Sequence, residues 1–200
     1  ELDRVRQALA AAFATLPREE VRTIADAVPH VCRESVQTVE DEMEVTQGKL
    51  SMGFSCGSDD MPALLLGNTL FGGSSNSKLF LNVREKLSLC YYASSMYHRQ
   101  KGIITVSSGI EFQNYRRAYD EILSQLAAVQ NGELEVWELA GARSTLLNSY
   151  ATVGDSQGKL ENFYLGQAAT GRSETPADLA QAVMEVSAER ICRALTTVQL

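Results

Sequence analysis

The stretch LFGGSSNSKLFLNVREKLSLCY spans Leu70–Tyr91 and contains the junction that decides the fold. Its glycine pair, Gly72-Gly73, ends an almost wholly apolar segment at 63–71, which is typical of a buried helix. Residues 77–86 then carry apolar side chains on one helical face, and 89–97 have the character of a strand. The stretch therefore predicts a buried helix, a turn, a short helix and a strand in direct succession.

The flanking sequence supplies further strands and helices. The side chains of Met43 and Val45, and then of Leu50, Met52, Phe54 and Cys56, alternate with polar or small residues, which predicts strand structure with one buried face. Gln47-Gly48 is either a turn or bulge between strands or part of one long strand. A second strand, at 103–110, is expected to form a hairpin with 89–97. Helices are expected at 2–14, 21–28, 114–129, 133–150, 156–169, 176–185 and 187–198. Grouped strands and helices predict an α+β fold, an antiparallel or mixed sheet with helices packed on one face.

Bulk composition limits the possible functions. The chain has 200 residues, 44% of them hydrophobic and 22% charged, as in a soluble globular protein. A formal net charge of -7 argues against a partner that is a nucleic acid or an anionic membrane. No apolar run is long enough to span a membrane. We expect a single domain over 1–200, and the helical start without an initiator methionine suggests a fragment of a longer protein.

The cysteines and histidines offer little catalytic chemistry. Four scattered cysteines, with no CxxC pair, favour reduced thiols and a cytoplasmic location over a disulfide framework: Cys32, Cys56, Cys90 and Cys192. The two histidines, His30 and His98, belong to no HxxEH motif and no ligand cluster. Cys90 has no histidine nearby in sequence, so a buried structural thiol is favoured over a nucleophile. We predict no catalytic residue and no metal ligand in this chain.

Arg84 and Tyr91 form the candidate binding pair. They lie seven positions apart, near the end of a predicted helix and at the start of a predicted strand, so a tight connection places them at one end of the sheet. A guanidinium and a phenolic hydroxyl can both donate to the carbonyl groups of an extended peptide, and the sheet edge could take that peptide as an added strand. The alternative is that Arg84 only complements its helix end or pairs with Glu85.

The order of these motifs resembles the signature of the insulinase/pitrilysin family of inverzincin zinc peptidases. The likeness rests on Gly72-Gly73, on the run Ser75–Phe80, on Val83–Lys86 and on Leu89–Tyr91, with Val45–Phe54 resembling the strand before them. It covers about residues 43–110. The family implies a metallopeptidase-half fold like that of mitochondrial processing peptidase, in which one half carries HxxEH and zinc. Since HxxEH is absent, this chain resembles the non-catalytic, C-terminal-type half.

The resemblance also implies roles. Arg84 and Tyr91 match the family's substrate-binding arginine and tyrosine, and zinc is expected only in the HxxEH-bearing half, in the same chain or in a partner subunit. This chain would complete the peptide-binding chamber and would not be active alone. The alternative is a degenerate structural or assembly subunit without productive substrate contact. Two departures stand out: Lys78 replaces a commoner arginine, and Leu87-Ser88 replaces a basic-glycine pair, which puts the turn before Tyr91 in doubt.

Overall fold

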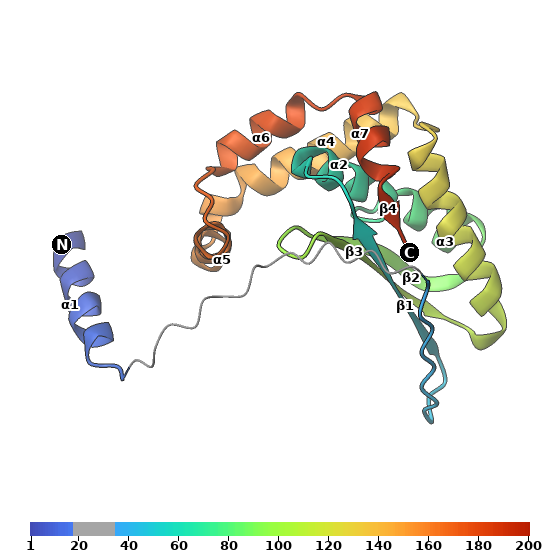
Figure 1. Ribbon diagram of the computed structural model, residues 1–200, viewed down its shortest axis with the longest axis horizontal. Helices are drawn as coiled ribbons and strands as arrows, with labels where there is room; N and C mark the ends of the chain where they lie inside the picture. The colour runs from blue at the N-terminus through green and yellow to red at the C-terminus, as the bar shows by residue number, and fades with distance from the viewer. Residues whose placement is uncertain (18–34) are drawn as a thin grey trace.

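The computed structural model describes residues 1–17 and 35–200 (Figure 1). The helix expected at 21–28, together with His30 and Cys32, lies outside these residues. The elements in chain order are α1 (Leu2–Ala14), β1 (Gly48–Cys56), α2 (Met61–Phe71), the π-helix η1 (Leu79–Lys86), β2 (Cys90–His98), β3 (Ile103–Ile110), the 3-10 turn η2 (Phe112–Asn114), α3 (Tyr115–Gln130), α4 (Val136–Ala151), the 3-10 turn η3 (Val153–Asp155), α5 (Gln157–Ala169), α6 (Pro176–Met184), α7 (Ala188–Leu195) and β4 (Val198–Gln199).

The strands form one four-stranded sheet in the order β2-β3-β1-β4, and each neighbouring pair is antiparallel. The β2–β3 hairpin and the long β1–β3 pairing make up most of it, with β1 in register from Gly48↔Ile110 to Ser55↔Ile103. β4 adds only the pairs Ser55↔Gln199 and Cys56↔Val198. The order leaves β2 at one edge of the sheet.

The helices lie on one face of this sheet, as Figure 1 shows for α2, α3 and α7. On β1, the side chains of Leu50, Met52, Phe54 and Cys56 are buried toward the helices, whereas the intervening side chains are exposed or half-buried. This alternation confirms the predicted α+β fold, with an antiparallel sheet covered by helices on one face.

Helix α2 is the centre of the core. The Asp60 carboxylate accepts a hydrogen bond from the Ala63 amide at 3.2 Å and caps the helix, and Pro62 occupies the first turn. Nine of its eleven residues are buried. Arg190 at the start of α7 donates to both oxygens of the same carboxylate, at 2.6 and 3.0 Å, so the cap also ties α7 to α2.

Some elements differ in extent from the prediction. The strand begins at Gly48, so Met43 and Val45 lie outside it, because β3 ends at Ile110 opposite Gly48 and offers no partner to earlier residues. The last helix ends at Leu195 rather than at residue 198. There the Gln130 side-chain amide donates to the carbonyl oxygens of Leu195 and Val198, and buried Val198 pairs with Cys56 instead of continuing the helix.

Helix α1 has its predicted bounds, but none of its residues is buried. Among the residues that the structure describes, no helix is both long and apolar enough to cross a bilayer.

Candidate functional site

Arg84 lies on the last turn of η1, and three contacts fix its guanidinium. Its Nε donates to the Tyr91 backbone carbonyl oxygen at 2.9 Å, and its Nη1 lies 2.7 Å from Glu85 Oε1. The guanidinium carbon also sits 4.7 Å from the centre of the Phe80 ring, which is a cation–π contact. The pairing with Glu85 that the sequence offered as the alternative is therefore present, and the contact with the Tyr91 carbonyl holds Arg84 against the start of β2.

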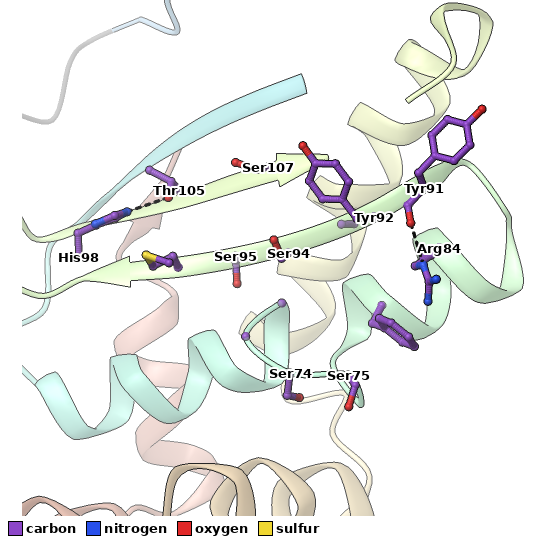
Figure 2. A pocket seen from close by; sticks show the side chains of 15 residues that line it. Ser74, Ser75, Arg84, Tyr91, Tyr92, Ser94, Ser95, His98, Thr105 and Ser107 are labelled. Atoms are coloured by element: carbon purple, nitrogen blue, oxygen red, sulfur yellow. Dashed lines mark hydrogen bonds between the residues drawn. The ribbon is translucent and has the colours of Figure 1, made fainter. Parts of the chain in front are cut away.

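A β-bulge sets the direction of Tyr91. Cys90 pairs with Ile110 and Tyr92 pairs with the adjacent Gly109, so Tyr91 is the extra residue on β2. Its ring is half exposed and points away from the Arg84 guanidinium (Figure 2). The Tyr91 hydroxyl donates to Glu111 at 3.4 Å. The structure thus joins Arg84 to Tyr91 through the tyrosine carbonyl, and the two side chains diverge.

The turn between Arg84 and Tyr91 keeps a backbone conformation that suits glycine. Ser88 has a φ of 49°, the one positive φ at a non-glycine position in the described part of the chain. Ser88 is exposed and stands at the departure noted in the sequence. The substitution therefore preserves the left-handed turn, which costs a serine more than a glycine. The Leu89 amide donates to the Val83 carbonyl oxygen at 3.0 Å and holds the turn against η1.

A cavity of about 600 Å³ runs along β2 and includes both members of the pair. Figure 2 shows the loop with Ser74 and Ser75 on one side of β2, and Ser107 and Thr105 of β3 on the other. The cavity is lined by Gly72, Gly73, Ser74, Ser75, Phe80, Arg84, Tyr91, Tyr92, Ala93, Ser94, Ser95, Met96, His98, Thr105 and Ser107. No aspartate or glutamate belongs to this described lining. Arg84 stands at one end of it, paired with Glu85 just outside.

The free edge of β2 is partly closed. The Ser95 amide donates to the Gly72 carbonyl oxygen at 2.9 Å, and the Ser95 hydroxyl donates to Asn68 Oδ1 at 2.7 Å. A Cβ on Gly72 would lie 2.6 Å from the Ser95 hydroxyl and 2.7 Å from its amide, so glycine permits this approach. With the Tyr91 carbonyl bonded to Arg84, a peptide cannot pair along the whole edge. Full β-strand addition, which the sequence suggested, does not fit β2.

Lys78 anchors the start of η1. Its Nζ donates to both oxygens of Glu138 on α4, at 3.0 and 3.1 Å, and both side chains are about nine-tenths buried. Glu138 also accepts from the Glu135 amide at 2.9 Å, so its second oxygen is shared with the cap of α4. Lysine therefore satisfies a site where the family more often has arginine. The importance of Glu138 could not be found from local sequence, since 60 residues separate the partners.

Among the residues that the structure describes, the remaining reactive side chains do not assemble a catalytic site. His98 Nε2 lies 2.9 Å from the Thr105 hydroxyl, within the hairpin. Burial is the main cause that raises the pKa of the half-buried Cys90 thiol, against smaller lowering effects of the Ser108 hydroxyl and Arg84. A raised pKa makes a poor thiolate nucleophile. Cys56, Cys90 and Cys192 are free thiols. Across residues 1–17 and 35–200, no three His, Cys, Asp or Glu side chains gather to hold a metal ion, so these side chains do not fit zinc.

The sequence matches a known protein family. The family model described as the peptidase M16 inactive domain matches residues 1–146. This chain belongs to the peptidase M16 family. The M16 assignment confirms the resemblance seen in the sequence, and the chain is an inactive M16 peptidase-type domain.

Two of three similar proteins are about twice as long as this chain. "Probable inactive metalloprotease YmfF" of Bacillus subtilis (strain 168) is 36% identical over 189 residues, which are 92% of this chain and 44% of that protein. A conserved protein from Enterococcus faecalis V583 superimposes with a TM-score of 0.82 and 27% identity, over 96% of this chain and 47% of its own. An inactive peptidase domain from Bordetella parapertussis has a TM-score of 0.64 and 16% identity, over 79% of this chain and 90% of its own. The chain thus spans about half the length of the first two.

Proposed function

We propose that this M16 domain is the non-catalytic, substrate-contacting half of a zinc-dependent metallopeptidase. The observation that carries the proposal is that Arg84 and Tyr91 line one cavity of about 600 Å³ beside β2. The HxxEH-bearing half, in the same polypeptide or in a partner subunit, would hold zinc and activate water, because the described side chains of this chain do not fit the metal. This chain would then hydrolyse no peptide alone.

Arg84 would bind a carbonyl group of the substrate peptide. Its Nε and Nη1 are held by the Tyr91 carbonyl and Glu85, and Phe80 lies against its guanidinium. Within the described residues Nη2 has no hydrogen-bond partner, so this fixed group retains donors for a peptide carbonyl. The Ser95 amide already donates to the Gly72 carbonyl oxygen and cannot pair with a peptide. The peptide would therefore lie at the Arg84 end of the cavity rather than along the whole edge of β2. The Tyr91 hydroxyl would need to leave Glu111 to join it.

The test is turnover in the complete two-half assembly. Arg84→Lys keeps the charge but removes the guanidinium fork. Because this removes a charged hydrogen bond to the peptide, we expect kcat/KM to fall by roughly 10- to 100-fold for substrate peptides of different sequence. Tyr91→Phe should give a smaller loss. Arg116→Lys is the matched control, because Arg116 is an exposed arginine on α3, outside the cavity, that pairs with Asp120 and lies over the Tyr119 ring. Size-exclusion chromatography would establish that each variant still assembles.

A second candidate is a structural or assembly half without productive substrate contact. Two observations favour it: Arg84 donates to the Tyr91 carbonyl oxygen of its own chain, and the Tyr91 ring points away from the Arg84 guanidinium (Figure 2). Turnover that is unchanged in both variants, with assembly intact, would support this candidate and reject the first. The free thiols of Cys56, Cys90 and Cys192 support the further proposal that the protein works in the cytoplasm.

A further inference from the structure

Helix α1 presents an apolar stripe that nothing in the described chain covers. Leu2, Val5, Leu9 and Phe13 recur at helical spacing, and Leu16 continues the same side beyond the helix end. These five side chains are between 52% and 83% exposed, and no residue of α1 is buried. In Figure 1 the helix stands apart from the sheet and its covering helices. The stripe is large enough to need a partner surface.

The composition of α1 indicates the kind of surface that it fits. Five of its thirteen residues are alanine, which favours the helix and lets a neighbouring element approach closely. A 13-residue helix is marginal in water without packing, so its stability must come from the surface that covers the stripe. Its charged side chains are Asp3, Arg4 and Arg6, with Glu1 directly before the helix, so its polar face is not strongly basic. A helix that lies on an anionic membrane has a basic polar face instead, so a protein groove fits better.

The M16 relatives indicate which protein supplies the groove. The body from Gly48 to Leu200 makes up about three quarters of the chain. The Enterococcus faecalis structure, about half of which is matched, covers 96% and therefore includes most residues before Gly48. The segment that contains α1 thus superimposes on part of a structure in which about as many further residues lie outside the superimposed region.

We infer that α1 docks through Leu2, Val5, Leu9, Phe13 and Leu16 into an apolar groove of the other M16 half, and so belongs structurally to that half. This inference rests on the family and on the exposed stripe, and it does not depend on peptide binding at Arg84.

Hydrogen–deuterium exchange tests the inference on two proteins: the 200-residue chain and the complete protein or assembly that contains it. We expect the amides of α1 to exchange with little protection in the chain alone and at least about ten-fold more slowly when the other half is present. Equal exchange in the two proteins would overturn the inference. This comparison uses unmodified sequences, so it does not depend on the folding of a variant.

Paired variants in the complete protein identify the face involved. Leu9→Ser with Phe13→Ser should abolish the protection of α1, whereas Arg4→Ser with Gln7→Ser, on the opposite side of the helix, should preserve it. Loss of protection in both pairs, or in neither, would contradict docking through the stripe. Two results with the chain alone would also overturn it: dimerisation that Leu9→Ser prevents would assign the stripe to a second copy, and binding to phosphatidylcholine–phosphatidylglycerol vesicles would assign it to a membrane.

Discussion

Ser88 lies in the turn that connects η1 to β2, in a backbone conformation that is unfavourable for a residue with a side chain. Its φ of 49° lies in the left-handed region, where glycine has no steric cost. We predict that Ser88→Gly raises the free energy of unfolding by about 0.5 kcal/mol, because relief of the left-handed strain exceeds the added entropy of the unfolded chain. Ser88→Val should lower it. The control is Ser156→Gly, at an exposed helix start with an ordinary φ of -136°, which should cost a few tenths of a kcal/mol. Urea unfolding measures all three, and a destabilising Ser88→Gly would refute the strain argument.

At the scale of elements, the Lys78–Glu138 pair joins the start of η1 to α4 and thereby fixes the helix that carries Arg84. Removing one partner leaves the other charge buried, so we predict that Lys78→Met lowers the free energy of unfolding by about 3 kcal/mol. Lys78→Arg should retain most of the stability because it keeps a donor to both carboxylate oxygens. The double variant Lys78→Met/Glu138→Leu should recover much of the loss. Arg116→Met, which breaks the exposed pair with Asp120, is the control and should change stability by less than about 1 kcal/mol. A loss as small for Lys78→Met as for Arg116→Met would show that the pair does not hold η1.

The same scale shows which elements the sequence could predict. Alternation in β1 and the cap and proline of α2 act over a few residues, and both elements formed, although β1 excludes Met43 and Val45. The direction of the Tyr91 ring depends on a one-residue bulge against β3, which seven-residue spacing along the chain cannot reveal. Closure of the β2 edge depends on Gly72, whose role in ending a helix concealed its approach to Ser95. Family resemblance identified the candidate pair, and long-range pairing determined its geometry.

At the scale of the whole molecule, α1 belongs to this chain but does not contribute to the hydrophobic core that stabilises it. The hydrophobic core of the described residues begins at Leu50 and includes α7 and β4, with no contribution from α1. We therefore predict that removal of residues 1–17 shifts the thermal midpoint of the isolated chain by no more than about 2 °C, since little apolar burial is lost. Leu195→Ala is the comparison. Leu195 is fully buried against Gly67, and its truncation should cost about 2–5 kcal/mol, or roughly 5–15 °C in the midpoint. Differential scanning calorimetry distinguishes the two, and a truncation as damaging as Leu195→Ala would mean that α1 stabilises this body directly. In the complete protein the same truncation should lower the thermal midpoint, because there it removes the contact between the apolar stripe of α1 and the groove of the other half.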